Sequence, residues 1–265
     1  MSVLVLGCGN MGAAIAAGVD QNGDEDVVAV DPDVQRAKSL LPPGSRVRVF
    51  SDLTQLTDRR FDLIIIGVKP NYVGEALQAC QASLAEAPLV SIAAGVSLAT
   101  MREVAGQHAR LIRVMPNLPA SVGAGMTVGY ADNLVDVDVL TRVERVFEAV
   151  GRFHWVSDEH DIDKVTAVAG SGPGYVFAFA QYLEAAAVEI GLPADLAAAL
   201  ARQTVVGAGR MLERDQRSAI DLKRAVTSPK GTTEAGLSVL EGPKGLPDLL
   251  DQCVKAAEQR AIELR

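Results

Sequence analysis

The sequence predicts an α/β domain with a doubly wound, mostly parallel sheet, followed by an all-α domain. In residues 1–157, short runs rich in Val and Ile alternate with helix-compatible stretches: VLVL, VVAV, RVRVF, LIIIGV, LVSIA and LIRVM. This alternation is typical of a parallel sheet covered by helices on both faces. In residues 158–265, strand signals disappear and Ala and Leu recur at helical spacing, so this part is predicted to be all-helical.

Composition and charge narrow the function classes. The 265 residues carry a formal net charge of −8, and neither half of the chain is basic. A nucleic-acid-binding protein needs a patch of Lys and Arg to neutralise phosphates, so we expect no nucleic-acid partner. With 49% hydrophobic and 22% charged residues, the chain has the composition of a folded protein and the length for two domains.

Cysteine usage and the first residues predict a cytoplasmic protein. Cys8, Cys80 and Cys253 are scattered and odd in number, without metal-ligand spacing or a disulfide framework. We therefore expect a reducing compartment and no metal site. The first residues resemble a strand, and they lack the basic region and the cleavage site of an export signal.

One long apolar stretch is predicted to be a buried helix rather than a membrane span. Residues 165–183 contain no charged side chain, and the stretch is close to membrane-spanning length. Because GSGPG interrupts it and Glu184 and Glu189 follow on the same predicted helix, we expect no membrane association. The uniformly apolar helices of residues 158–265 favour a subunit interface, and thus a homodimer or a larger homo-oligomer.

A glycine-rich loop after the first predicted strand indicates dinucleotide binding. VLVL runs into GCGNMG, which places Gly7, Gly9 and Gly12 at the spacing of a Rossmann fingerprint. We expect Gly7 to allow a tight turn, Gly9 to let a diphosphate approach the backbone, and Gly12 to let the helix pack closely. The helix that starts near Asn10 and Met11 would face the anion with free N–H groups. The alternative is a glycine turn with only a structural role.

The residue after the second predicted strand bears on the choice of cofactor. VVAV is followed by Asp31, nineteen residues beyond Gly12, where a carboxylate can accept hydrogen bonds from the adenosine ribose. A carboxylate there would repel a 2′-phosphate, so NADH is favoured over NADPH. The alternative is that Asp31 only caps the following helix.

Six motifs carry a resemblance to a known family. They are GCGNMG, GVKP at 67–70, SIAAGVS at 91–97, MPN at 115–117, GSGPGY at 170–175 and VTSPKGTTEAGL at 226–237. In this order and spacing the chain resembles the pyrroline-5-carboxylate reductases over nearly its whole length. The resemblance implies a Rossmann domain followed by a helical dimerisation domain. It also implies reduction of 1-pyrroline-5-carboxylate to L-proline with NADH or NADPH, the last step of proline synthesis.

The resemblance also implies where the cofactor lies. It assigns the nicotinamide half to the VKP and AAG segments, which supply Val68, Lys69, Pro70, Ala93 and Ala94, with Asn117 nearby. For Lys69 we favour a role in holding backbone or cofactor oxygens over a catalytic role.

The loop before a late predicted helix is the candidate carboxylate site. Pro229 is expected to fix the approach of the chain, and Gly231 to allow an unusual backbone angle before a helix that starts near Thr232. The resemblance implies that the substrate carboxylate binds the N–H groups of Gly231 and Thr232 and the hydroxyl of Thr233. Further substrate contacts implied by the motifs are Ser171, Gly172, Thr227 and Ser228. The alternative is a helix start that the threonines only cap.

One position of this loop departs from the family pattern. Lys230 stands where the family usually has a glycine. It places a cation beside the proposed carboxylate site, and the sequence leaves open whether this cation strengthens anion binding or points to solvent.

Hydride transfer to an imine requires few ionisable side chains, because the protonated C=N is already the electrophile. The three histidines, His108, His154 and His160, lie outside the motifs, so catalysis is expected to be positioning. Thr166 matches the family threonine that bonds the substrate nitrogen and is the candidate catalytic residue. The alternative for Thr166 is a hydroxyl bonded to the preceding helical turn.

Three other functions are alternatives to this one. The β-hydroxyacid dehydrogenases share the architecture but need a lysine four residues after a second GxG, where this chain has Val176. The sequence does not distinguish reductases of different cyclic imine acids. A non-catalytic dinucleotide-binding module of the same fold would bind the cofactor without turnover.

Overall fold

A computed structural model describes residues 1–23, 25–56, 59–83 and 87–265. Strands and helices alternate up to residue 155, and every later element is helical. The strands are β1 (Ser2–Leu6), β2 (Asp26–Val30), β3 (Arg48–Phe50), β4 (Leu63–Ile66), β5 (Leu89–Ser91), β6 (Leu111–Met115), β7 (Gly125–Ala131) and β8 (Gly151–Trp155). The helices are α1 (Asn10–Asn22), α2 (Val34–Leu40), α3 (Val73–Ser83), α4 (Leu98–Ala105), α5 (Val137–Glu148), α6 (Asp161–Val165), α7 (Gly172–Glu189), α8 (Ala194–Arg214), α9 (Ala219–Ala225), α10 (Thr232–Leu240) and α11 (Leu246–Glu263). Shorter turns of helix are η1 (Leu53–Leu56), η2 (Pro70–Tyr72), η3 (Leu118–Val122) and the π-helix η4 (Thr166–Gly170).

The described strands form one sheet in the order β3-β2-β1-β4-β5-β6-β7-β8. Pairing is parallel throughout, apart from the antiparallel pair β6–β7. The chain order runs one way from β1 to β3 and the other way from β4 to β6, so the topological switch point lies between β1 and β4. Ligands of doubly wound folds bind at the carboxyl ends of the strands beside such a point. The predicted mostly parallel sheet is confirmed.

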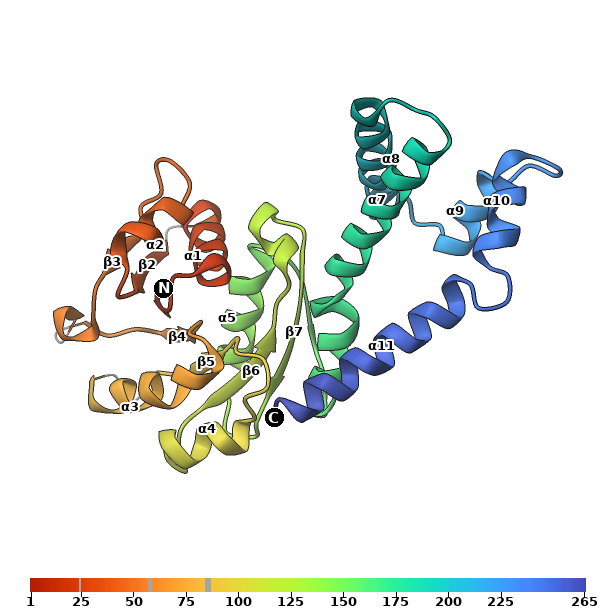
Figure 1. Ribbon diagram of the computed structural model, residues 1–265. Coiled ribbons are helices and arrows are strands. Elements are labelled where there is room, and N and C mark those ends of the chain that lie inside the picture. Colours follow the sequence, from red (N-terminus) through yellow and green to blue (C-terminus); the bar gives the residue numbers. More distant parts are fainter. Residues whose placement is uncertain (24, 57–58, 84–86) are drawn as a thin grey trace. The chain divides into compact units, whose positions relative to one another are not determined.

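Helices cover both faces of the sheet, as the continuous apolar runs of the central strands require (Figure 1). On one face, Val3 and Val5 of β1 join a core that includes Ile15 of α1 and Phe147 of α5. On the other face, the alternate residues of β1 join a core with the apolar side chains of α3 and α4.

Two strands of the sheet were absent from the sequence prediction. The prediction named six apolar runs, whereas the sheet also contains β7 and β8. The sequences GMTVGYA and GRFHW lack a dense Val and Ile run, because β7 carries two glycines and a threonine, and β8 carries polar residues on one face. Their pairing with β6 and with each other extends the sheet beyond β6.

The chain divides into two compact units. The first comprises Met1–Ser171 together with Ala257–Arg265, and the second comprises Gly172–Ala256. All described elements after Trp155 are helical. Residues 158–171 are nevertheless part of the first compact unit. Within the first unit, Arg113 of β6 pairs with Asp163 of α6 and with Glu159, which lies just before this helix.

The second unit is helical, and its helices expose much apolar surface. Residues 172–189 do form a helix, but none of the described residues of α7 is buried, so the predicted burial is wrong for the single chain. Phe177 is 58% exposed and Tyr182 is 68% exposed. Apolar surface of this extent is typical of a helix that another chain covers. No helix in the described ranges combines the length and apolarity needed to cross a membrane.

Candidate active site

The loops that follow β1, β2 and β4 lie together at the carboxyl edge of the sheet. The N–H of Gly7 donates to Val30 O of β2 at 2.8 Å, and the N–H of Gly67 donates to Leu6 O of β1 at 2.7 Å. The N–H of Ile92, after β5, donates to Ile66 O at 3.1 Å. These bonds bring the sequence-predicted cofactor segments to one edge beside the switch point.

The three fingerprint glycines occupy three different environments. Gly7 has φ +89°, and a Cβ there would lie 2.7 Å from the carbonyl carbon of Gly67. A Cβ on Gly12 would overlap the carbonyl oxygen of Gly7, whereas a Cβ on Gly9 would meet no atom within 4 Å. The turn and the helix contact therefore exclude side chains at Gly7 and Gly12, and the surface above Gly9 is open for a ligand.

The start of α1 has hydrogen-bond donors to spare. Gly9 is its N-cap and offers no side-chain acceptor, and the first turn holds no acidic residue. Among the hydrogen bonds of the described residues, none uses the N–H of Asn10, Met11 or Gly12. Free donors and the positive end of the helix dipole suit a phosphate.

Asp31 lies at the end of β2 with both carboxylate oxygens engaged. Oδ2 accepts the N–H of Cys8 at 2.9 Å, and Oδ1 accepts the N–H of Asp33 at 2.9 Å. Asp33, not Asp31, caps α2 by accepting the N–H of Arg36. The carboxylate of Asp31 is therefore tied to the glycine loop. Burial, together with the charge of Asp31, raises the pKa of the Cys8 thiol to about 11, so this thiol is neutral.

The remaining predicted cofactor residues follow β4, β5 and β6. Val68 is half-buried, and Lys69 and Pro70 are exposed at the start of η2. Ala93 is buried and Ala94 half-buried in the loop after β5. These segments succeed one another along the carboxyl edge in strand order.

Both the nitrogen and the oxygen of the Asn117 side-chain amide form hydrogen bonds within the protein. Its Nδ2 donates to Ala169 O at 3.0 Å, and its Oδ1 accepts the N–H of Met126 at 2.8 Å. The side chain is 8% exposed. Asn117 therefore connects the end of β6 to β7 and to the π-helix η4, which contains Thr166.

Thr166 opens η4, a π-helical turn of the kind often found at functional sites. Its hydroxyl donates to Ile162 O at 2.7 Å. This is the hydrogen bond to the preceding helical turn that is the alternative role for Thr166. Its carbonyl accepts the N–H of Ser171 at 2.9 Å. The lone pairs of the Thr166 hydroxyl remain available to a donor, since the hydroxyl proton is committed to Ile162.

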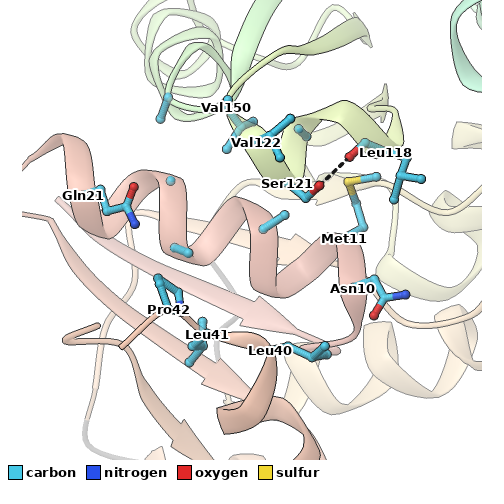
Figure 2. A pocket seen from close by; sticks show the side chains of 16 residues that line it. Asn10, Met11, Gln21, Leu40, Leu41, Pro42, Leu118, Ser121, Val122 and Val150 are labelled. Atoms are coloured by element: carbon cyan, nitrogen blue, oxygen red, sulfur yellow. Dashed lines mark hydrogen bonds between the residues drawn. The ribbon is translucent and has the colours of Figure 1, made fainter. Parts of the chain in front are cut away.

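A cavity of about 660 Å³ lies along the outer side of α1. Figure 2 shows Met11 of α1 with Leu118 and Val122 of η3 on one side and Leu41 and Pro42 on the other. Asn10 and Met11 line this cavity, but Gly7, Gly9 and Asp31 do not. The cavity therefore adjoins the predicted dinucleotide site at the start of α1 but includes neither the glycine loop nor Asp31.

In the second unit, the start of α10 is also left without a side-chain cap. Gly231 is the N-cap and offers no side-chain acceptor. In the hydrogen bonds of the described residues, the N–H groups of Thr232, Thr233 and Glu234 have no acceptor. Three free donors at a helix start form a small anion site.

The loop differs from expectation at two residues. Gly231 has φ −83°, an ordinary angle, and it is Lys230 that adopts the left-handed conformation, with φ +59°. Space at 231 is tight, because a Cβ there would lie 2.4 Å from the Ser228 hydroxyl and 3.0 Å from the Ser228 carbonyl oxygen. The N–H of Gly231 donates to Ser228 O at 3.0 Å, so it is not the free donor that was expected.

The other predicted substrate residues have the following places. Thr227 donates its hydroxyl to Lys223 O at 2.7 Å, and Ser228 is exposed in the same loop. Ser171 ends the first unit and Gly172 begins α7 in the second.

One cluster was missed by the sequence analysis. Arg113 of β6 is 1% exposed and pairs with Glu159 at 3.2 Å and with Asp163 at 3.0 Å. The signal was present, since a charged residue inside the apolar run LIRVM requires a buried partner. In the part of the chain that the structure describes, no group of three or more His, Cys, Asp or Glu side chains could hold a metal ion.

Comparison with known proteins gives the family. A family model described as pyrroline-5-carboxylate reductase dimerisation matches residues 159–264, and one described as NADP oxidoreductase coenzyme F420-dependent matches residues 2–95. The pyrroline-5-carboxylate reductase of Pseudomonas aeruginosa is 34% identical over 265 residues, covering 99% of this chain and 96% of the relative. The chain belongs to the pyrroline-5-carboxylate reductase family. The reductase of Synechocystis is 38% identical, with 98% of this chain and 97% of the relative covered.

Solved structures of the family have the same fold. The pyrroline-5-carboxylate reductase of Coxiella burnetii matches with a TM-score of 0.89 at 33% identity, over 99% of this chain and 97% of that one. The reductase of Plasmodium falciparum, solved with NADP bound, matches with a TM-score of 0.83 at 27% identity, over 100% and 98%. The resemblance drawn from the six motifs is confirmed, and so is the Rossmann domain followed by a helical dimerisation domain.

Proposed function

We propose that this member of the family reduces 1-pyrroline-5-carboxylate to L-proline with NADH or NADPH. The full-length match to reductases of that name supports the activity. The observation that carries the proposal for the substrate is the uncapped start of α10, where three N–H groups converge behind a glycine N-cap.

The residues at the carboxyl edge of the sheet fit a dinucleotide. The open space above Gly9 and the free N–H groups of α1 suit the diphosphate, and Asp31 suits the ribose hydroxyls. We assign the nicotinamide half to Val68, Lys69, Pro70, Ala93 and Ala94. When bound, this cofactor supplies the hydride.

The loop before α10 fits the substrate carboxylate. We assign its anion contacts to the N–H groups of Thr232 and Thr233 and to the hydroxyl of Thr233. The N–H of Glu234 adds a third donor, and the dipole of α10 favours the negative charge. We keep Ser171, Gly172, Thr227 and Ser228 as further proposed substrate contacts.

The chemistry needs orientation more than proton transfer. Hydride adds to the carbon of the protonated C=N, the π electron pair moves to nitrogen, and the product amine keeps the proton. A protonated imine is an N–H donor. The Thr166 hydroxyl donates to Ile162 O, so its oxygen presents lone pairs that can accept this N–H. Thr166 thus orients the reacting bond without being a general acid.

The family match supports a proposal for the assembly, and the cysteines support one for the compartment. The dimerisation model over residues 159–264 indicates a homo-oligomer, and we propose a dimer or a multiple of it. Cys8, Cys80 and Cys253 are free thiols, which supports our proposal of a reducing cytoplasm.

The test is a spectrophotometric assay of NADH and NADPH oxidation with 1-pyrroline-5-carboxylate, followed by detection of proline. We expect turnover, and in Thr233→Ala a rise of about 10-fold in KM for the imine, the effect of losing one hydrogen bond to a charged group. The KM for the cofactor should be unchanged, because the proposed function assigns Thr233 no contact with the cofactor.

A matched control is Ser238→Ala on the same helix, whose hydroxyl only bonds back to Ala235 O. It should leave both KM values as they are. Cofactor binding without any proline formed would favour the non-catalytic module instead, and faster turnover of a six-membered cyclic imine would move the assignment to that substrate.

A further inference from the structure

A buried ion cluster lies between the proposed nicotinamide loop and the helix of Thr166. Arg113 projects from β6 with 1% of its surface exposed, and its guanidinium contacts Glu159 and Asp163 at 3.2 and 3.0 Å. Its neighbours in the strand are apolar. Burying such a triad adds little to stability compared with apolar side chains of the same volume, but it fixes the geometry of the groups that it joins.

The first group joined is the loop after β5. Glu159 Oε1 accepts the N–H of Leu98 at 2.9 Å as well as the Arg113 guanidinium. Leu98 is the first residue of α4 and directly follows the segment Ala93–Ser97. Glu159 therefore anchors the far end of the proposed nicotinamide loop.

The same loop is held at its middle by the residues after α11. Gly95 has φ +74°, and a Cβ there would collide with the carbonyl oxygen of Leu264. The adjacent Arg265 lies 3.4 Å from the Asp163 carboxylate. Leu264 and Arg265 thus connect the loop to the ion cluster from a second direction, within the first unit.

The second group joined is the π-helix. Asp163 is 2% exposed and stands three residues before Thr166 on α6. The neighbouring Ile162 accepts the Thr166 hydroxyl. From the other side, Asn117 holds the Ala169 carbonyl of η4. The backbone around Thr166 is therefore fixed by the cluster at one end and by Asn117 at the other.

We propose that Arg113, Glu159 and Asp163 are positioning residues that hold the Ala93–Gly95 loop and Thr166 in a fixed relation for hydride transfer. The proposal rests on the proposed function, because it takes the cofactor to lie on this loop and the imine nitrogen to meet Thr166. Arg265 and Leu264 serve as a clamp on the same loop. None of these residues touches the substrate, so their effect passes through the loop and through Thr166.

The experiment compares Glu159→Ala with Asp20→Asn. Glu159→Ala frees the Leu98 N–H and removes one partner of Arg113. Asp20→Asn weakens another ion pair of the first unit, in which the buried Asp20 carboxylate of α1 binds the exposed Arg46. Both variants lose stability, but only the first disturbs the proposed positioning.

For Glu159→Ala we expect the dissociation constant of NADH, measured by the fluorescence of the bound nucleotide, to rise about 5-fold. The single-turnover rate of NADH oxidation with saturating imine should fall about 10-fold, with its amplitude retained. Asp20→Asn should change neither value. If Glu159→Ala does not fold, Glu159→Gln keeps an acceptor for Leu98 and loses the charge, and at least a 3-fold fall in the same rate is expected.

A purely structural role predicts another result. Misfolded protein lowers the amplitude of the single turnover and leaves its rate and the NADH dissociation constant unchanged, and that outcome would overturn the proposal. The proposed function fails separately, if the unmodified enzyme does not reduce 1-pyrroline-5-carboxylate. The NADH dissociation constants would still show whether the cluster positions the loop.

Discussion

At the residue scale, Asp31 holds the glycine loop and is the residue that we expect to set the cofactor preference. Its oxygens accept the N–H groups of Cys8 and Asp33, so the negative charge is held at the end of β2 beside the glycine loop. A 2′-phosphate brought to the ribose site would meet this charge at short range, where screening by salt is weak.

We predict that Asp31→Ser shifts the ratio of kcat/KM for NADH over NADPH about 10-fold toward NADPH. The serine removes the charge and keeps a small polar side chain. Steady-state kinetics with each cofactor at saturating imine measures the shift. Asp33→Ser is the comparison, because serine can still cap α2, and it should give a smaller change. An unaltered ratio in Asp31→Ser would reject the ribose role.

At the scale of elements, two helix starts in the second unit are built alike. In PKGTTE and PKGLPD a lysine with φ +59° precedes a glycine. In each, a carboxylate four residues on accepts the lysine N–H, from Glu234 at 2.7 Å and from Asp248 at 2.9 Å. The left-handed angle costs a lysine about 1 kcal/mol relative to glycine.

Lys230→Gly is therefore expected to stabilise the protein by up to about 1 kcal/mol. The gain is the backbone strain that glycine relieves, reduced by the larger conformational entropy that glycine gives the unfolded chain. Lys230→Ala keeps the strained angle and should give no gain. Urea unfolding at fixed protein concentration measures the difference, and a glycine variant less stable than the alanine variant would contradict it. An equal rise in KM for the imine in both variants would assign the lysine charge a role in carboxylate binding.

At the scale of the whole molecule, the second unit requires a partner. Its exposed apolar side chains include Phe177, Phe179 and Tyr182 of α7. They lie within the segment that matches the dimerisation family model. Burying such aromatic side chains is the main source of interface stability.

We predict that Phe177→Glu converts the oligomer to smaller species at micromolar concentration, because a buried unpaired charge opposes association. Val137→Glu is the control, since Val137 is 75% exposed and lies in the first unit. Sedimentation velocity distinguishes the two. Equal sedimentation coefficients for the Phe177→Glu variant and the unmodified protein would contradict the assignment of α7 to the subunit interface.

The elements that carry the proposed cofactor site were predictable because they are encoded in contiguous segments. The strand-to-helix turn of GCGNMG and the placement of Asp31 after β2 depend on local spacing, and the comparisons confirm the family. In the proposed substrate loop, the helix start at Thr232 was predicted, but the backbone angles were not. The strained residue is Lys230 rather than Gly231, since a backbone angle depends on which neighbours need their N–H groups satisfied.

The sequence by itself determined the alternation of strand and helix, the dinucleotide loop and the family, because apolar periodicity and glycine spacing act over short stretches of chain. Only the tertiary structure decided that β7 and β8 extend the sheet. It also decided that Arg113 pairs with Glu159 and Asp163, which lie 46 and 50 residues away in the chain. It also decided that Leu264 lies against Gly95. These contacts arise when distant segments are buried together, and no local pattern specifies which buried charge will find which partner.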